Sequence, residues 1–514
     1  MFLRHRAVLL VLLLIVGSFR TTASRAQDPA AKRLFDDAEN LLSKGDAGAA
    51  LAQFQLITRQ FPTDELTPKA LLKMARLYRS SDESQELRAA LNKLLNDYPR
   101  TGEAASGFLI QAEMKVAKAR TLSDLDEARS VFRRVPLLYG PEEFPGLAAR
   151  ALARIRGGEL ALLAGDTEAA EAEFVAVVED EAGSPLVGRA ALLLGRTLLQ
   201  KAVLDGSGST SGSMGHALET LQTLKDDAQA SPDDRADAAN LLSIAHRQIL
   251  RPQSGREPWQ QVLRFPAGGA ALREPIGVAA AEDGRVLVVD RREGRVQLLE
   301  ASGSVSANRN LKSPQRPAWS GDVALVVTDS EIVLPFDGRR MSFLEPKNNK
   351  ERQLKGLRAA VRGPFGDWFM VAKNWKAILN YQTPRKGQEL SSRERTNFDD
   401  LDRDSAGRVY ALDGKNKTVT RVALDRRTQK TIIQGGAVWK KPTALAVDLL
   451  GNVYVLDRGR RQIHHYDMNG TLKTTVGPVL GDGVELRDPR DVAVDGSGRL
   501  FVADAKLPFV AVLD

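Results

Sequence analysis

The chain has 514 residues, and its 73 lysines and arginines against 65 aspartates and glutamates give a formal net charge of +8 at pH 7. It contains no cysteine, which excludes disulfide bonds, thiolate metal sites, cysteine nucleophiles and a lipid-modified N-terminal cysteine. Because this length exceeds what one hydrophobic core usually supports, we expect two or more domains.

The charge is distributed unevenly along the chain. Residues 1–26 carry +4, residues 27–250 carry −7 and residues 251–514 carry +11, and these three values sum to +8. An acidic front half and a basic back half predict two surfaces that have different partners or that face each other.

The N-terminus has the pattern of a secretory signal. Arg4 and Arg6 precede an apolar run from Ala7 to Val16, and Ser24-Arg25-Ala26 supplies small residues before a cut, so the mature chain is expected to begin at Gln27. The alternative is an uncleaved anchor helix, although the apolar run is shorter than the ~20 residues that a span requires. No later stretch could span a membrane. We therefore expect an exported, soluble protein of the periplasm or the exterior.

Residues 27–250 have helical periodicity and many alanines and leucines. One amphipathic helix is predicted over Ala31–Leu42, and Gly45 ends it. Asp46 is placed to cap a second helix, Gly48–Gln60. The landmarks Ala50, Phe54 and Pro62 resemble those of the tetratricopeptide repeat, a helix–turn–helix unit of about 34 residues.

Further copies of this unit follow, and each should bury enough apolar surface only when stacked on its neighbours. The segment FPTDELTPKALLKMARLY also resembles repeats of bacterial envelope assembly and division proteins, which implies a periplasmic setting. Residues 205–215 are predicted to be a loop, and a last helix is predicted over Asp233–Ile249. The landmarks of the later units are Ala75, Tyr78, Leu91, Pro99, Ala128, Phe132, Gly158, Gly165, Asp166, Ala170, Phe174, Gly195, Leu198, Ala217 and Leu221.

The back half contains short β-rich runs that end on aspartate. A turn glycine is followed six positions later by an aspartate in four places, at Gly284, Gly407, Gly451 and Gly498. Two weaker copies are expected between them, one with Glu331 and Asp337 in these positions and one with Gly366 and Ala372. Six units at about 40–50 residues each are typical of a β-propeller.

The motif Pro489–Asp504, PRDVAVDGSGRLFVAD, resembles the NHL repeat, and the resemblance covers about half of the chain. It implies a six-bladed propeller, and it does not by itself imply an activity. The predicted fold class is therefore multidomain α plus all-β, with a tetratricopeptide-like α-solenoid before an NHL-type six-bladed propeller. The predicted parts are a signal peptide over 1–26, helical repeats over 27–250, a linker over 251–258 and the propeller over 259–514.

Closure of the ring should use an N-terminal strand. The chain ends at the third strand of the sixth blade, so the lone strand Trp259–Phe265 is predicted to supply the fourth. Such pairing removes an open sheet edge.

Turns after the second strand of each blade and turns between blades should share one face, and turns after the first strand should lie on the other. The first set is basic and the second is acidic, so a basic face is predicted to bind an acidic protein or an anionic glycan or lipid headgroup. The alternative is that these are solvated turn residues, and that the tryptophans near them are buried packing residues. The residues assigned to the binding face are Arg291, Arg292, Arg339, Arg340, Lys415, Lys417, Trp439, Lys440, Arg458, Arg460 and Arg461.

No catalytic constellation is recognised in the sequence. The repeated aspartates are predicted to accept hydrogen bonds from backbone N–H groups of their turns. His464 and His465 are adjacent on a strand, so their side chains point to opposite faces and cannot chelate together. No cofactor or metal is predicted, and Ca²⁺ held at the axis by scattered aspartates and asparagines stays open.

The sequence therefore favours an exported, non-enzymatic scaffold. Its helical repeats would offer a groove to a peptide or protein, and its propeller would offer the basic face to a second partner. The export signal argues against nucleic acid as that partner. The alternative is a metal-dependent, lactonase-like propeller hydrolase or lyase with a helical assembly module.

Overall fold

The computed structural model describes residues 27–81, 84–119, 121–204, 212–253, 257–259, 261–267, 271–346, 352–390, 397–422 and 429–514. The predicted signal peptide and most of the predicted loop over 205–215 lie outside these residues. The described chain falls into two compact units, one up to Phe108 and one from Leu109 onward. The second unit holds both helices and the propeller, with the switch to strands at the predicted linker.

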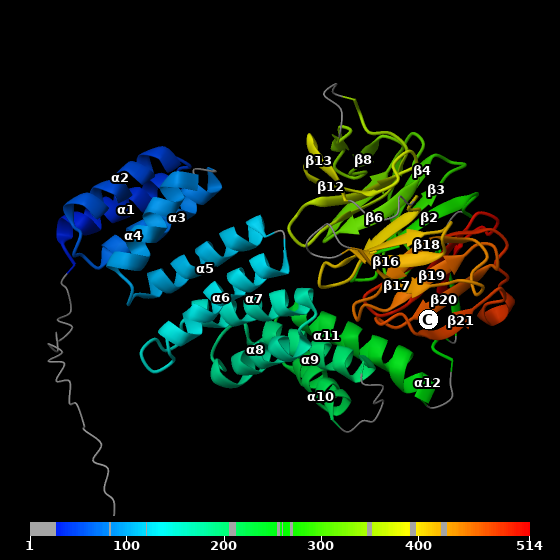
Figure 1. Ribbon diagram of the computed structural model, residues 1–514, viewed down its shortest axis with the longest axis horizontal. Coiled ribbons are helices and arrows are strands. Elements are labelled where there is room, and N and C mark those ends of the chain that lie inside the picture. The colour runs from blue at the N-terminus through cyan, green and yellow to red at the C-terminus, as the bar shows by residue number, and fades with distance from the viewer. Residues whose placement is uncertain are drawn as a thin grey trace, which may run out of the picture. The chain divides into compact units, whose positions relative to one another are not determined.

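The front half is built of antiparallel helix pairs, as predicted (Figure 1). The last predicted helix continues through a π-helical turn into a short α-helical segment, so it ends at Gln253 rather than at Ile249. The helices are α1 (Pro29–Ser43), α2 (Ala47–Gln60), α3 (Leu66–Ser80), α4 (Ser84–Asp97), α5 (Gly102–Lys118), α6 (Leu122–Leu138), α7 (Ala148–Ala164), α8 (Thr167–Asp180), α9 (Val187–Leu204), α10 (Ser213–Asp226), α11 (Pro232–Ala245), η1 (His246–Leu250) and α12 (Arg251–Gln253).

Local sequence explains where these helices begin and how they pair. Asp46 accepts a hydrogen bond from the Ala49 N–H at 3.0 Å, which confirms its predicted capping role. Small residues bring paired helices together: a Cβ at Gly158 would lie 2.5 Å from the ring of Phe174, and one at Gly195 would lie 2.5 Å from Leu221. Each of these glycines leaves the space that the large side chain of the partner helix fills.

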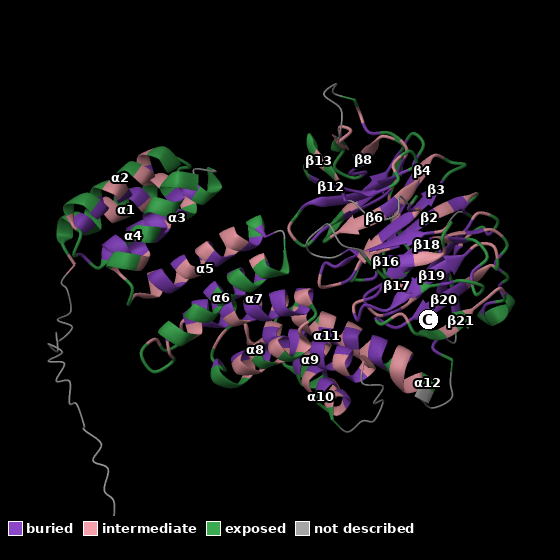
Figure 2. Cartoon of the chain, viewed as in Figure 1, coloured by how far each residue is buried: buried purple, intermediate pink, exposed green. Residues whose placement is uncertain are grey.

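The back half forms six four-stranded antiparallel sheets within the described residues, one for each predicted blade. Figure 2 shows how far the strands are buried. The sheets are β2 (Pro275–Ala280), β3 (Val286–Asp290), β4 (Arg295–Leu299) and β5 (Val305–Asn310) in blade one; β6 (Arg316–Ser320), β7 (Val323–Val327), β8 (Glu331–Val333) and β9 (Arg340–Ser342) in blade two; β10 (Leu357–Arg362), β11 (Trp368–Ala372), β12 (Ile378–Thr383) and β13 (Lys386–Leu390) in blade three; β14 (Asp400–Arg403), β15 (Val409–Asp413), β16 (Thr418–Val422) and β17 (Gln429–Gln434) in blade four; β18 (Pro442–Val447), β19 (Val453–Asp457), β20 (Gln462–Tyr466) and β21 (Leu472–Val476) in blade five; and β22 (Pro489–Val494), β23 (Leu500–Asp504), β24 (Val510–Leu513) and β1 (Val262–Phe265) in blade six.

The predicted closure of the ring is confirmed. Strand β1 pairs with β24 in antiparallel register, from Val262 opposite Leu513 to Phe265 opposite Val510. The Gln261 and Asp514 backbones exchange two further hydrogen bonds, each 3.0 Å long. The first propeller strand therefore completes the last blade, and the ring has no open join at this point.

The predicted register of blade two is wrong. Glu331 does not occupy the turn between the first two strands, because it begins the third strand, β8. That turn contains Gly321, which has φ 57°, and the second strand ends six residues later at Val327. The segment EIVLPFD was misleading because it has apolar residues and a final aspartate, whereas the true second strand, VALVV, lacks that aspartate. With this correction the turn glycines, Gly284, Gly321, Gly366, Gly407, Gly451 and Gly498, follow one another at 37, 45, 41, 44 and 47 residues by subtraction.

Candidate binding surfaces of the propeller

The basic face consists of the turns after the second strand of each blade and the connections between blades. Most of the predicted residues lie there, because alternate turns of an antiparallel sheet lie at opposite ends of the blade. These are Arg291 and Arg292 after β3, Lys415 and Lys417 after β15, Lys440 before β18, and Arg458, Arg460 and Arg461 after β19.

Two residues assigned to this face belong to the opposite end of the propeller. Arg339 lies between β8 and β9, the third and fourth strands of blade two, and Arg340 begins β9. The error follows from the wrong register of this blade, which placed a turn after the third strand where one after the second strand was expected. Both arginines also have carboxylate partners, Asp337 for Arg339 and Glu331 for Arg340.

Trp439 cannot serve as a binding residue on the surface. Its side chain is buried, and its indole Nε1 donates to the Tyr466 hydroxyl at 2.9 Å. The two rings meet edge to face at 5.9 Å between their centroids. The alternative interpretation of this residue, a buried packing role, is therefore correct.

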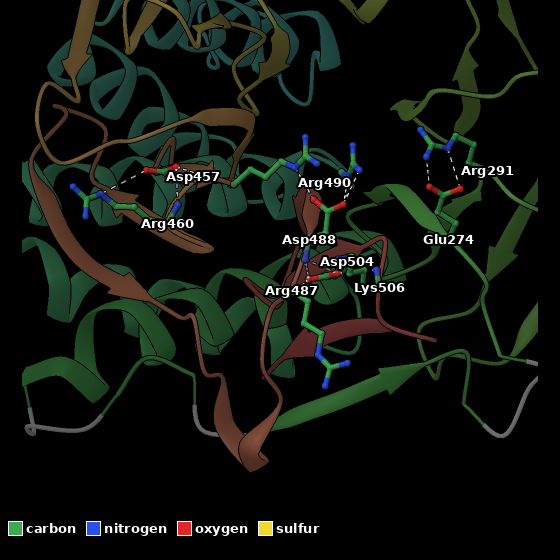
Figure 3. Close-up of polar contacts among 11 residues, drawn as sticks. Glu274, Arg291, Asp457, Arg460, Arg487, Asp488, Arg490, Asp504 and Lys506 are labelled. Atoms are coloured by element: carbon green, nitrogen blue, oxygen red, sulfur yellow. Dashed lines mark hydrogen bonds and ion pairs between the residues drawn. The ribbon is translucent and has the colours of Figure 1, made fainter.

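Ion pairs neutralise only part of the positive charge of the basic face. Arg291 pairs with Glu274, and Arg460 lies 3.9 Å from Asp457 (Figure 3). Arg461 pairs with Glu485 at 2.7 Å. Other exposed cations of this face have no carboxylate partner within the described parts of the chain: Arg292, Lys373, Lys376, Lys415, Lys440, Lys441, Arg487 and Lys506. This surplus gives the face a positive potential.

The repeated aspartates have the predicted structural role. Asp457 accepts from the backbone N–H groups of Lys441, Gly459 and Arg460 at 2.8–3.2 Å, so it holds its own turn and the start of the blade together. Asp504 does the same in blade six, accepting from Arg487, Asp488 and Lys506 (Figure 3). Asp290 and Asp413 bind their turns similarly. Asp337 also accepts from a backbone N–H of its turn, that of Arg339 at 2.8 Å, but it is exposed and pairs with the Arg339 guanidinium as well.

The opposite, acidic face is in contact with the helices of the same compact unit. Gln200 of α9 donates to the Leu450 carbonyl at 3.2 Å, and Asn240 of α11 donates to the Glu282 carbonyl at 3.1 Å. Gln248 donates to the Tyr454 hydroxyl at 2.5 Å. Leu450 belongs to the apolar core of α7–α11 and is 1% exposed.

Arg247 makes the charged contacts of this interface. Its guanidinium bonds to the Ser497 carbonyl and to the carboxylate of Asp514, and only 9% of its side chain is exposed. The turns after the first strands of blades one, five and six are thus engaged by the chain's own helices. Polar backbone groups that would otherwise face solvent are paired there.

A cavity of about 520 Å³ lies along the propeller axis on the side of α11. Its walls come from the inner strands of the blades and from Asp233, Asp237 and Asn240 of α11. Burial, followed by the charge of Glu282, raises the pKa of Asp237 to about 6. Burial likewise raises the pKa of Asp402, at the end of β14, to about 7.

Arg316 extends across the axis from blade two. Its guanidinium contacts Asp400 of blade four and lies 3.5 Å from Asp491 of blade six, and its Nη2 donates to the Thr443 carbonyl of blade five at 3.5 Å. Burial opposes the charge of Arg316, but the two carboxylates outweigh it and raise its pKa. Burial raises the pKa of both aspartates, and Arg316 opposes that shift.

The same two aspartates also connect neighbouring blades. Asp400 accepts from the Leu445 N–H of blade five at 2.8 Å, and Asp491 accepts from the Val278 N–H of blade one at 3.1 Å. These residues were not predicted as a group. The available signal was charge within the first strand of a blade: three of the four residues of β14, DLDR, are charged, and Asp491 precedes an apolar run in β22, PRDVAV.

The histidines behave as buried packing residues. His465 stacks on Tyr454 at 4.7 Å, while His464 bonds through Nδ1 to the Thr475 hydroxyl at 3.1 Å. Burial lowers the pKa of His465 to about 3, so it is neutral at physiological pH. In the described part of the chain no group of three or more His, Cys, Asp or Glu side chains is arranged to hold a metal ion.

Comparison with known families matches part of the front half. The profile of a family described as outer membrane lipoprotein, YfiO, matches residues 27–145, which are part of the helical repeats. No curated protein matches the chain. None of the helices over the described ranges combines the length and apolar character required to cross a bilayer.

Several solved structures resemble about half of the chain at low identity. They include regucalcin, a calcium-binding protein from Agrobacterium tumefaciens (16% identity, 49% of this chain, 92% of that chain, TM-score 0.38). They also include a virginiamycin B lyase from Staphylococcus aureus (12%, 48%, 81%, 0.34) and the WD40 propeller domain of Doa1 (11%, 50%, 96%, 0.37). At these values the similarity says nothing about activity.

Proposed function

We propose that this protein is an exported, non-enzymatic scaffold whose basic propeller face binds an acidic protein or an anionic polymer of the cell envelope. The observation that carries this proposal is the difference between the two faces. Helices α9 and α11 contact turns of the acidic face, whereas the basic face carries exposed cations that have no carboxylate partner among the described residues. The propeller would thus be held from one side and offer the other to its partner.

The match of residues 27–145 to an outer membrane lipoprotein family supports a location in the periplasm. The predicted signal sequence supports the same location. A partner there would meet the basic face without competition from nucleic acid, which is why an acidic protein or an anionic glycan or lipid headgroup is proposed instead.

The helical repeats would bind a separate peptide or protein segment. Two adjacent apolar side chains at the C-terminal end of α6 support this part of the proposal: Leu137 is 81% exposed and Leu138 55%. Large exposed apolar side chains that lie together commonly mark protein interaction sites. The scaffold would connect this segment to the partner of the propeller.

The basic face is tested by reversing charges that have no carboxylate partner. We expect Lys415→Glu combined with Lys440→Glu to weaken binding of poly-L-glutamate at least tenfold at low salt, measured by biolayer interferometry. The matched control is Arg339→Glu with Arg340→Glu, which makes the same charge change at the other end of the blades. Equal weakening by both pairs, or no binding by the unmodified protein, would contradict the proposal.

A further inference from the structure

Two arginines of the basic face share one carboxylate. Arg458, in the turn after β19, donates Nε to Asp488 Oδ1 at 2.6 Å. Arg490, in β22, donates Nε and Nη2 to Asp488 Oδ2 at 3.1 and 2.6 Å. The two guanidinium groups come from neighbouring blades and are held side by side by this one acidic residue. Their side chains are 29% and 27% exposed.

Asp488 is fixed in position by the backbone around it. Its N–H donates to both carboxylate oxygens of the buried Asp504 at 2.9 Å, and its carbonyl accepts from the Ala505 N–H at 3.0 Å. Burial raises the pKa of Asp488, but the hydrogen bonds from Arg458 and Arg490 outweigh burial and lower it. Asp488 is therefore ionised at neutral pH and orients both arginines.

The charge around Asp488 is positive. One carboxylate faces two guanidinium groups, and the preceding residue, Arg487, is exposed and extends away from Asp488 (Figure 3). Arg291 lies near enough for Asp488 to help raise its pKa, after the larger effect of Glu274. Within the described residues, Asp488 is the one acceptor bonded to Arg458 or Arg490, so their remaining N–H groups are available.

We propose that Arg458 and Arg490, oriented by Asp488, form a binding site for a phosphoryl group. A guanidinium fork bonds well to a phosphate or a carboxylate. A planar carboxylate has two oxygens and suits one fork, whereas a phosphate monoester has three terminal oxygens and about −1.5 to −2 charges, so it can accept from two forks at once. This site deepens the proposed function of the basic face and rests on it.

The site is tested with inorganic phosphate as the probe, by isothermal titration of the mature protein in phosphate-free buffer. We expect Arg458→Gln combined with Arg490→Gln to weaken phosphate binding at least tenfold. Lys415→Gln combined with Lys440→Gln removes the same charge from the same face, and we expect it to weaken binding less than twofold. Arg490→Lys keeps the charge but not the fork, and we expect it to weaken binding at least threefold without loss of folding.

A second arm identifies the source of the phosphoryl group. Cosedimentation with vesicles of phosphatidic acid, but not of phosphatidylcholine, would support a lipid headgroup, and phosphate binding without cosedimentation would support a soluble ligand. Equal weakening by the two double variants, or full affinity of Arg490→Lys, would overturn the site. Binding of poly-L-glutamate without any binding of phosphate would overturn the site and leave the basic face in place.

Discussion

At the scale of single residues, Arg316 has the greatest consequence for the propeller. It connects blade two to blades four, five and six across the axis, where Asp400 and Asp491 are 2% exposed. A buried ion pair of this kind adds little net stability over an apolar replacement, but removing one partner leaves uncompensated buried charge. The three residues should therefore behave as a unit.

We expect Arg316→Met to lower the free energy of unfolding by about 3–5 kcal/mol, because Asp400 and Asp491 would lose their counter-ion. Urea denaturation followed by circular dichroism measures this change. Adding Asp400→Asn and Asp491→Asn should recover most of the loss, since no buried carboxylate then remains. A triple variant less stable than Arg316→Met would contradict the assignment of the loss to unpaired charge.

Asp402 should make stability depend on pH. Burial raises its pKa from 3.8 to about 7, so between these values the folded protein binds a proton that the unfolded chain has released. Its contribution to stability therefore falls as pH rises from about 4 to about 7. The Asp402 carboxylate accepts from the backbone N–H groups of Arg403 and Val447. Asp402→Asn keeps one of these two acceptor oxygens and has no ionisable group.

Urea denaturation at pH 5 and pH 8 tests this expectation. We expect the loss of stability between these two pH values to be smaller in Asp402→Asn than in the unmodified protein. Asp283→Asn is a suitable control, because Asp283 is an exposed aspartate of the same end of the propeller. An equal pH dependence of stability in both variants would show that Asp402 does not cause the loss of stability between pH 5 and pH 8.

At the scale of elements, strand β1 decides whether the ring closes. It is the outer strand of blade six, so one of its edges pairs with β24 and the other pairs with no strand of the described residues. Gln261 and Asp514 form a hydrogen-bonded pair, so Leu263 and Val512, two positions further, should form the next one, while Arg264 directs its N–H away from β24. A proline at position 263 would therefore remove a hydrogen bond between β1 and β24, whereas a proline at position 264 would not.

We expect Leu263→Pro to lower the thermal unfolding temperature by roughly 5 °C or more, because it removes a ladder hydrogen bond at the closure. Arg264→Pro is the matched control and should lower it less, since its N–H is not in that ladder and its main loss is the contact with the Phe509 ring. Differential scanning calorimetry distinguishes the two. Equal effects would mean that closure does not depend on this pairing.

At the scale of the whole molecule, the second compact unit joins helical repeats to propeller through a mixed apolar and polar interface. Leu449 and Leu450 pack with the helical core, and Arg247 bonds to the last residue, Asp514. The helices thus occupy backbone carbonyls in the acidic-face turns of blades one, five and six, and these carbonyls cannot bind another partner at the same time.

We expect Leu450→Asp to weaken this interface, because it places a charge among buried apolar side chains. Amide hydrogen exchange should then be at least tenfold faster in α11, as the helix loses protection against local opening. Leu472→Asp is the control, since Leu472 is 43% exposed on β21. Unchanged exchange in α11 would show that the interface contributes little to its stability.

Local sequence patterns were enough to predict most of the elements and the number of blades. Helical periodicity, the capping Asp46 and the turn glycines are effects that act within a few residues, so each leaves a local pattern. The repeat of those patterns was sufficient to predict helix pairs, six blades and a first strand that completes the last blade. The same dependence on local pattern caused the error in blade two, where EIVLPFD imitates a second strand.

The tertiary structure decided which of these parts meet. Arg316, Asp400 and Asp491 lie far apart in the chain and come together only because closing the ring places their strands around one axis. The burial of Trp439, the pairing of Arg458 and Arg490 on Asp488, and the contact of α9 and α11 with the acidic face have the same origin. Contacts between distant segments leave no period in a single sequence, because either partner alone has the pattern of an ordinary turn, strand or helix residue.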